Sequence, residues 1–332
     1  MTNITTFIAT TGNDLVRATL TGGSKWSVET LLRDKGISCL AKDPGNPDVI
    51  YIGTKNQGIW CSEDFGLTWH AKGLSGRYIK SIAVNMHDSN IIYAGIKPAL
   101  MFISMDRGNT WTELKGFRYI PHRWWWFSPA EPPDIRPYVI AIAPSPSEPE
   151  VLLAGIEFGA VVRSDDNGQS WSPHLHGALR DCHSLKFHST NGNYVYQAGG
   201  TGGGAAFSLD GGHTFQREQQ GIAKDYGIVC ASDSADPETW YICVASSPFR
   251  AFGKDPETYL YRNNGDNNWK PIGWTQHPLP ATPTVLETPQ NLPGYLYAGL
   301  TNGEVWYTTD YGENWEKLPF NLQKIWFNML VR

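Results

Sequence analysis

The sequence is poor in charge and lacks the features that define several large classes of protein. Only 18% of its 332 residues are charged, and the formal net charge is −5, which gives no basic surface for nucleic acid. No apolar run reaches the length of a membrane span, and residues 1–14 lack the basic and apolar segments of a signal peptide. We therefore expect neither a nucleic-acid partner nor a membrane.

Cysteine is also scarce, and its pattern is not that of a disulfide framework or a zinc site. The five cysteines are odd in number, contain no Cys-x-x-Cys pair, and mostly lie in apolar, strand-like segments. Small buried thiols in a reduced, cytoplasmic compartment are therefore expected. The chain has no phosphate-binding P-loop, no dinucleotide fingerprint and no nucleophile elbow, so we predict no cofactor.

Glycine, proline and aromatic residues are abundant, with 34 Gly, 22 Pro, 14 Trp and 15 Tyr, which favours short strands joined by tight turns. One motif, Ser-x-Asp-x-Gly-x-Thr-Trp, recurs along the chain, and we call it the Asp-box. Degenerate copies end at Trp26 and Trp269. Three clear copies occupy residues 62–69, 104–111 and 164–171, and two close variants occupy residues 208–215 and 308–315.

The spacing of these copies predicts the fold. The terminal aromatics of the seven copies are separated by 43, 42, 60, 44, 54 and 46 residues, and each unit contains four strand-like segments. Periods of this length are typical of β-propeller blades. The first copy lacks its opening strand, whereas residues 324–331 form an unpaired one. We predict an all-β, single-domain, seven-bladed β-propeller of four-stranded blades spanning 1–332, closed by the C-terminal strand completing blade 1.

The Asp-box itself is predicted to be structural. Short Ser and Asp side chains hydrogen-bond nearby backbone amides, glycine takes a positive φ, and the final Trp packs as an apolar wedge. A metal-binding or catalytic role for each Asp is the alternative, but identical groups in every repeat are typical of architecture. The structural interpretation covers Asp64, Asp106, Asp166, Asp210 and Asp310.

These repeats resemble the BNR/Asp-box repeats of the sialidase-like superfamily over essentially the whole chain. That superfamily includes sialidases, sortilin-type propellers, xyloglucan-cleaving endoglucanases and photosystem II assembly factors. The resemblance implies the propeller fold, while one fold hosts many activities. Sialidases have six blades and the endoglucanases use a cleft between two propellers, so no activity of the superfamily transfers residue by residue.

Two insertions point to the ligand-binding face. The two long spacings place extra residues at 116–137, between blades 3 and 4, and at 246–257, between the second and third strands of blade 6. Both positions lie at strand ends opposite the Asp-boxes, and long loops in a compact repeat are frequently functional.

The first insertion contains His122, Arg123 and the aromatic run Trp124, Trp125 and Trp126. One interpretation is a lid whose aromatics bury the loop itself. The other is a stacking wall for a sugar ring, with the cations holding an anionic group.

A second set of candidates lies at the expected mouth of the central channel. Glu157 and Asp181 are the predicted catalytic acid and base, because two carboxylates that bracket a bond are typical of glycosidases. The alternatives are that both carboxylates pair with arginines, or that Glu157 joins His122 and His183 around a metal, although our prediction is no metal. The predicted ligand-binding residues of this mouth are Arg77, Arg136, Tyr138, Arg180, His183, Tyr226 and Trp326.

Three functions remain open at this point. The first is a glycosidase-like hydrolase or lyase that acts on a small glycan or organic anion. The second is a non-catalytic propeller that binds the same kind of ligand. The third is an assembly scaffold that holds a protein partner on its loop face.

Overall fold

The computed structural model describes residues 4–200, 204–266, 268–273, 279 and 281–332. The chain divides into two compact units, and each is described by itself. Unit 1 holds Met1–Ile37, Gly200–Ala205 and Glu218–Arg332. Unit 2 holds Ser38–Gly199 and Ala206–Arg217. The assignment of 1–332 to one domain stays a prediction.

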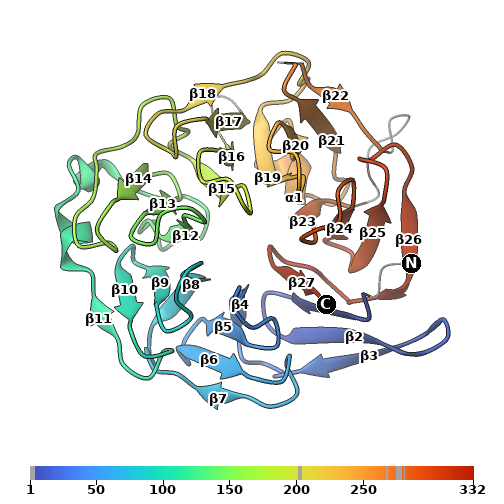
Figure 1. Ribbon diagram of the computed structural model, residues 1–332, viewed down its shortest axis with the longest axis horizontal. Coiled ribbons are helices and arrows are strands. Elements are labelled where there is room, and N and C mark those ends of the chain that lie inside the picture. The colour runs from blue at the N-terminus through green and yellow to red at the C-terminus, as the bar shows by residue number, and fades with distance from the viewer. Residues whose placement is uncertain (1–3, 201–203, 267, 274–278, 280) are drawn as a thin grey trace. The chain divides into compact units, whose positions relative to one another are not determined.

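Unit 2 carries four antiparallel sheets in chain order (Figure 1). The first two are β4 (Ile37–Lys42), β5 (Ile50–Thr54), β6 (Ile59–Ser62) and β7 (His70–Ala71), then β8 (Tyr78–Val84), β9 (Ile92–Lys97), β10 (Met101–Ser104) and β11 (Thr112–Glu113). The next are β12 (Val139–Pro144), β13 (Leu152–Ile156) and β14 (Val161–Ser164), then β15 (Cys182–Phe187), β16 (Val195–Gly199), β17 (Ala205–Ser208) and β18 (Gln216–Arg217). Strand β8 packs against β5 and β12, and β12 packs against β15. The second strands β9 and β13 are buried at every residue, so they contain nearly continuous apolar runs instead of alternating ones.

Unit 1 carries three sheets. One contains β27 (Met329–Val331), β1 (Thr6–Thr10), β2 (Leu15–Gly22) and β3 (Lys25–Leu31). Another contains β19 (Tyr226–Ser232), β20 (Thr239–Ala245), β21 (Thr258–Asn264) and β22 (Lys270–Pro271). The last contains β23 (Pro283–Glu287), β24 (Leu296–Leu300), β25 (Glu304–Thr308) and β26 (Glu316–Asn321).

The seven sheets confirm the predicted all-β, seven-bladed β-propeller fold, and the predicted closure is confirmed within unit 1. Strand β27 pairs antiparallel with β1, with Phe7 opposite Val331 and Ala9 opposite Met329. The C-terminal strand therefore covers the edge of β1 that would otherwise present unpaired backbone groups.

One blade departs from the four-stranded pattern. The sheet of β12, β13 and β14 has three strands, and its fourth position is irregular. Ser172 N still donates to Arg163 O, but Pro173 follows and has no N–H for a ladder bond. The Nδ1 atom of His174 accepts from Val161 N instead, at 3.1 Å.

The Asp-boxes join the third and fourth strands and are hydrogen-bonded within themselves. In the copy at 62–69, Ser62 Oγ accepts from Gly66 N at 2.7 Å, and Asp64 accepts from Thr68 N at 2.8 Å. Gly66 has a φ of 91°, the left-handed value that the motif predicts. The same bonds recur in the copies at 104–111, 164–171, 208–215 and 308–315. The structural interpretation of the repeated aspartates is confirmed.

A second repeated feature is a β-bulge in the first strand of five sheets, where one extra residue interrupts the pairing with the second strand. Bulges of this kind bend a strand and redirect a side chain. The extra residues are Lys80, Ile140, His183, Ile228 and Thr284.

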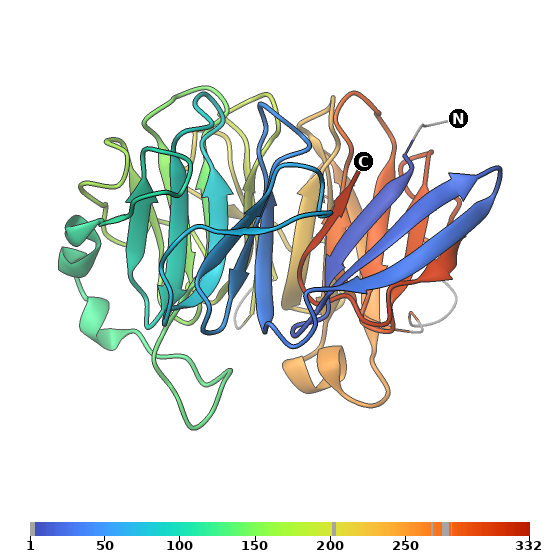
Figure 2. The same ribbon diagram turned by 90° about the horizontal axis from the view of Figure 1, so that it is seen from below.

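The insertions form short helical turns at the ends of their sheets. The first contains the 3-10 helices η1 (Lys115–Tyr119) and η2 (Arg123–Trp125), and the second contains α1 (Pro248–Phe252). In Figure 2 the first insertion extends past the strand ends of unit 2. No helix in the described part of the chain is long and apolar enough to cross a membrane.

The Asp-box turn makes a stability prediction. Replacing Ser62 with Ala leaves the buried Gly66 amide without its acceptor, which costs about 1–3 kcal/mol of unfolding free energy. We expect the urea midpoint of Ser62→Ala to fall accordingly, while Glu63→Ala, at an exposed position of the same turn, stays near the wild type. Equal midpoints for the two variants would contradict the structural role of the box.

Candidate functional site

Three ionisable side chains of unit 2 meet where β13 ends and β15 begins, and we call them the acid cluster: Glu157, Asp181 and His183. His183 Nε2 lies 3.4 Å from Asp181 Oδ1 and 3.9 Å from Glu157 Oε1. Both carboxylates are buried, with 6% of Glu157 and 3% of Asp181 exposed. The two predicted catalytic residues and one predicted ligand-binding residue are therefore brought together.

Local backbone structure positions each member of this cluster. Glu157 follows β13 directly, and its N–H donates to Tyr138 O at 3.1 Å. Asp181 directly precedes β15, and His183 is the extra residue of that strand's bulge. Because a bulge redirects its side chain, it accounts for an imidazole between the buried residues Cys182 and Ser184.

The environment of Glu157 favours its protonated form. Burial raises its pKa, and the negative charge of Asp181 acts in the same direction, while His183 and Lys80 oppose them. The result is a pKa of about 7, compared with 4.5 for an ordinary glutamate. A carboxylic acid that is half-protonated near neutral pH can both donate and accept a proton, which acid–base catalysis requires.

The acid cluster also has a spacing that would suit a metal ion, since its ligand atoms lie within 4.8 Å of one another. It is the one such group in the described part of the chain, and His122 is not in it. The alternative metal set that included His122 is therefore wrong. The positive charge of Lys80 acts on Glu157 and disfavours a second cation there, so we interpret the cluster as an acid–base group.

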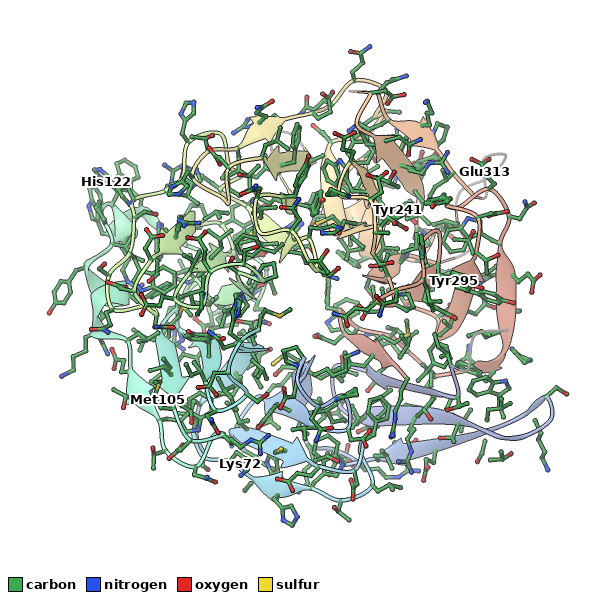
Figure 3. The ribbon with its side chains drawn as sticks, viewed as in Figure 1. Lys72, Met105, His122, Tyr241, Tyr295 and Glu313 are labelled. Carbon is green, nitrogen blue, oxygen red and sulfur yellow. The ribbon has the colours of Figure 1, made fainter. Side chains whose placement is uncertain are left out.

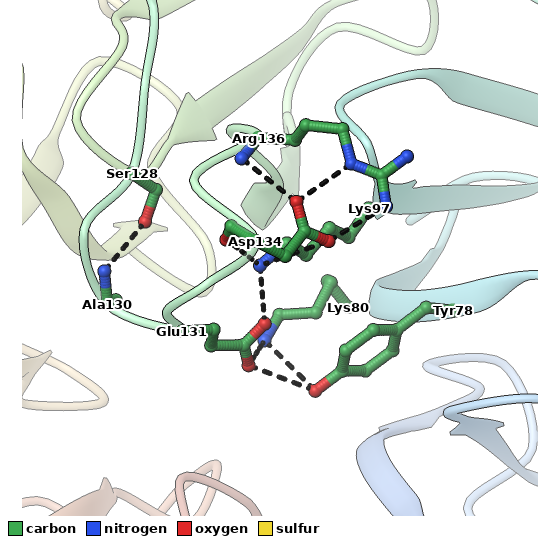
Figure 4. Close-up of polar contacts among 8 residues, drawn as sticks. All are labelled: Tyr78, Lys80, Lys97, Ser128, Ala130, Glu131, Asp134 and Arg136. Carbon is green, nitrogen blue, oxygen red and sulfur yellow. Dashed lines mark hydrogen bonds and ion pairs between the residues drawn. The ribbon is translucent and has the colours of Figure 1, made fainter.

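A second polar cluster lies beside the first and is built around two lysines, Lys80 and Lys97, which we call the lysine pair. The carboxylate of Glu131, from the first insertion, lies between them, at 2.9 Å from Lys80 Nζ and 2.8 Å from Lys97 Nζ (Figure 4). Tyr78 Oη donates to the same carboxylate at 3.1 Å. The Lys80 ammonium also lies 3.9 Å from the centre of the Tyr138 ring.

The charges of the two clusters act on one another. Burial lowers the pKa of Lys80, and both Glu131 and Glu157 counteract this effect. Burial works to raise the pKa of Glu131, but Lys80 and Lys97 outweigh it and hold the pKa at about 2. Lys80 therefore interacts with a carboxylate of the insertion and with a carboxylate of the acid cluster at once.

The first insertion reaches these lysines by crossing the ends of its own sheet. Arg118 pairs with Glu113 on β11, Arg123 donates to Ala99 O beyond β9, and Glu131 contacts β9 and β8. Arg123 also donates to Phe117 O, so its guanidinium holds the loop together. Its predicted role in ligand binding stays a prediction.

The three tryptophans of the aromatic run differ in burial. Trp126 is buried in the core, and a Cβ on Gly159 would come within 3.2 Å of its ring, so Gly159 permits the close packing. Trp124 and Trp125 are exposed and lie against each other, with ring centres 4.7 Å apart. Figure 3 shows His122 in the same outer part of unit 2. Trp126 therefore fits the burying interpretation, and the stacking interpretation stays a prediction for Trp124 and Trp125.

The predicted arginines lie apart from the carboxylates that they were expected to pair with. Arg136 pairs with Asp134 at 2.8 Å, and Arg180 donates to Gly159 O at 3.2 Å. Arg77 is exposed, with its guanidinium 5.9 Å from the Phe102 ring. The alternative in which Glu157 and Asp181 pair with Arg136 and Arg180 is wrong, because Asp134 engages Arg136 and Arg180 donates to a backbone carbonyl.

Two predicted ligand-binding residues belong to unit 1. Tyr226 begins β19, and Trp326 packs against Phe252 of the second insertion, with ring centres 5.5 Å apart. Lys324 Nζ lies 4.1 Å from the centre of the Trp326 ring. Their participation in one site with the acid cluster stays a prediction.

Sequence reasoning missed Lys80 and Glu131, although a signal for one of them was present. Lys80 is a single charged residue in the apolar segment IKSIAV, and it occupies the same bulge position as His183. A comparison of the repeats at this bulge position would have singled out Lys80 together with His183. Glu131 carries no such signal, because only the folded insertion brings it to the lysines.

Comparisons with known proteins support the fold. No family model matches the chain. The photosystem II assembly lipoprotein Ycf48 of Synechococcus sp. (strain CC9902) is 24% identical over 288 residues, which are 84% of this chain and 74% of that protein.

Two solved structures are similar in fold. The GH74 xyloglucanase of Xanthomonas campestris has a TM-score of 0.60 and 18% identity, and the match covers 85% of this chain and 45% of that one. This chain thus spans less than half of that enzyme. Ycf48 bound to D1 peptide has a TM-score of 0.57 and 14% identity, with 85% and 81% covered. The resemblance to endoglucanase and photosystem II assembly-factor propellers is confirmed at the level of fold.

The raised pKa of Glu157 makes stability depend on pH. Between pH 4.5 and about 7 the folded protein binds more protons than the unfolded chain, so unfolding free energy falls as the pH rises. From pH 5 to pH 8 the unfolding free energy of the wild type should fall by about 2 kcal/mol because of Glu157. Glu157→Gln should lack this fall, which urea unfolding at both pH values measures. Glu150→Gln, at an exposed position, should retain the wild-type pH dependence. An unchanged pH dependence in Glu157→Gln would show that Glu157 titrates normally.

Proposed function

We propose that the protein is a glycosidase-like hydrolase or lyase that acts on a small glycan or organic anion at the acid cluster. The observation that carries this proposal is the buried Glu157, with a pKa of about 7, beside a second carboxylate and an imidazole. Structural ion pairs rarely keep a carboxylic acid half-protonated at neutral pH, whereas acid–base catalysis depends on it.

The geometry favours one version of glycoside hydrolysis. Retaining glycosidases hold their two carboxyl groups about 5–5.5 Å apart, and inverting ones hold them roughly 6.5–9.5 Å apart. Glu157 and Asp181 present oxygens within 4.8 Å of each other, which favours the retaining arrangement. In that reaction Glu157 protonates the leaving oxygen while Asp181 bonds to the anomeric carbon. Water then attacks the anomeric carbon, gives a proton to Glu157, and releases Asp181 as a carboxylate.

Asp181 suits the role of nucleophile because His183 lies beside its carboxylate. The Nε2 atom of His183 lies 3.4 Å from Asp181 Oδ1, so the imidazole stands next to the oxygen that would bond to the substrate. Glu157, at 3.9 Å from the same imidazole, is opposed in its ionisation by burial and by Asp181. The acid of a glycosidase must carry a proton at the working pH, and the raised pKa of Glu157 suits that role.

A second candidate function is non-catalytic binding, and a different observation favours it. Trp124 and Trp125 form an exposed aromatic pair on the first insertion, a surface typical of sites that bind a sugar or a protein. The similarity to Ycf48, which has been solved with the D1 peptide, supports a protein partner for this chain. In this version the protein is a ligand-binding propeller or an assembly scaffold.

The catalytic and the binding function agree in the expected compartment and in requiring no cofactor. The five cysteines are free and buried, which supports a reducing compartment such as the cytoplasm. Neither function requires a cofactor, since protons and a nucleophile suffice for the reaction proposed.

Loss of turnover in Glu157→Gln tests the catalytic proposal. In a panel of chromogenic glycosides and uronides, removal of the proton donor should lower kcat by about 10²–10⁴-fold, while ligand affinity stays within twofold. Glu150→Gln is the control and should retain full turnover. A panel with no turnover by the wild type, or an active Glu157→Gln, would reject the hydrolase.

Trp125→Ala separates the second candidate from the first. Loss of one aromatic face should weaken a glycan or peptide held on the insertion by roughly 2–10-fold, measured by isothermal titration calorimetry. Binding that is weakened in Trp125→Ala and unchanged in Glu157→Gln would favour the binding propeller. Binding that is insensitive to Trp125→Ala would exclude the aromatic pair as the contact surface.

A further inference from the structure

The lysine pair, on two neighbouring strands, binds a carboxylate that comes from a loop. Lys80 is the bulge residue of β8, Lys97 ends β9, and Tyr78 begins β8, so all three donors are anchored in one sheet. The carboxylate they bind belongs to Glu131, in the insertion that crosses the end of this sheet. Figure 4 shows the Glu131 carboxylate against the two ammonium groups and the phenol.

Burial makes an anion at this point necessary. The side chains of Lys97 and Lys80 are only 3% and 11% exposed, whereas that of Glu131 is 34% exposed. Two ammonium groups removed from water require a negative partner, because an uncompensated buried charge costs several kcal/mol. The two lysines are therefore the buried side of this ion-pair contact, and the Glu131 carboxylate is the side that solvent reaches.

Lys97 is partly compensated without Glu131. Its Nζ donates to Asp134 O at 2.9 Å and lies 3.7 Å from Asp134 Oδ2. The Asp134 carboxylate is in turn engaged by Arg136. Lys80 has Tyr78 Oη at 3.4 Å and the Tyr138 ring as its other neighbours. These contacts keep both lysines in place while the carboxylate between them is exchanged.

We infer that Lys80, Lys97 and Tyr78 form a carboxylate-binding subsite, in which Glu131 stands in for the carboxylate of a sugar acid or small organic acid. The ligand displaces the carboxylate of Glu131, while Asp134 of the same insertion keeps its contact with Lys97. This inference rests on the proposed function only in placing the subsite beside the catalytic Glu157; binding itself needs no turnover.

The exchange of one carboxylate for another conserves the charge of the site. A ligand carboxylate replaces the hydrogen bonds that Glu131 makes and leaves the lysines compensated, so the displacement has little electrostatic cost. A neutral sugar offers no such replacement. The negative charge of Glu131 also helps to raise the pKa of Glu157, and a ligand carboxylate in the same place preserves this effect. The subsite therefore selects acidic ligands and keeps Glu157 able to donate a proton.

Calorimetric titration of D-glucuronate into the wild type and Glu131→Gln tests the subsite. Glu131 competes with the ligand from within the chain, so its removal should tighten glucuronate binding at least fivefold. D-glucose, the neutral counterpart, should not gain affinity. Glu150→Gln, which changes an exposed glutamate outside the subsite, should bind glucuronate as the wild type does.

Two further variants show whether the lysine pair is the contact. Lys97→Met in the Glu131→Gln background should abolish the gain in glucuronate affinity. Tyr78→Phe removes one hydroxyl donor and should lower the affinity two- to fivefold, which gives a second readout if Lys97→Met does not fold. Succinate, titrated in parallel, identifies an organic acid as the ligand class if it shows this pattern and glucuronate does not.

The outcomes separate this inference from the proposed function. If neither glucuronate nor succinate binds Glu131→Gln more tightly than the wild type, the subsite is rejected. The same holds if the gain survives both Lys97→Met and Tyr78→Phe. If the gain depends on these residues but no glycoside or uronide is turned over, the subsite stands and the hydrolase fails.

Discussion

The burial of the Lys80 ammonium is the interaction on which the candidate site depends. This charge lies between a carboxylate of the first insertion, Glu131, and the ring of Tyr138, and it acts on Glu157. Without Glu131 the lysine would lack its nearest counter-charge, and the insertion would lose its contact with β8. Without Lys80 the ionisation of Glu157 would be opposed still more strongly. One buried cation thus links the docking of a loop to the protonation of an acid.

The scaffold explains how a repeated fold acquires a site that is not repeated. The first strands of five sheets have a bulge at the same position, and the bulge presents one side chain that the regular pairing would have placed differently. In unit 2 this side chain is Lys80, Ile140 or His183, depending on the sheet. The backbone therefore repeats a position, and the residue at that position decides its chemistry. The Asp-boxes are the contrasting case, because there the repeated residue serves the turn alone.

The sequence predicted the fold and part of the site. Seven Asp-boxes and an unpaired terminal strand were sufficient for the propeller, since each signal is local and repeated. Glu157, Asp181 and His183 were predicted because they depart from the repeat at strand ends. The alternative pairing of Glu157 and Asp181 with Arg136 and Arg180 was wrong, in part because the local turn of the insertion places Asp134 against Arg136. The aromatic run could not be divided into buried and exposed tryptophans, because a loop without periodicity does not indicate which side chains face the core.

The sequence by itself determined the blades and the turns, because short-range hydrogen bonds and apolar repeats specify them within a few tens of residues. It also indicated the closing strand, since the repeat pattern shows both the strand missing from the first blade and the unpaired strand at the end. Only the tertiary structure decided that Glu131 lies between Lys80 and Lys97, and that Glu157 shares His183 with Asp181. These contacts join residues far apart in the chain or on different sheets. Their energies depend on burial and on the distances between charges, and neither quantity is set until the strands have packed.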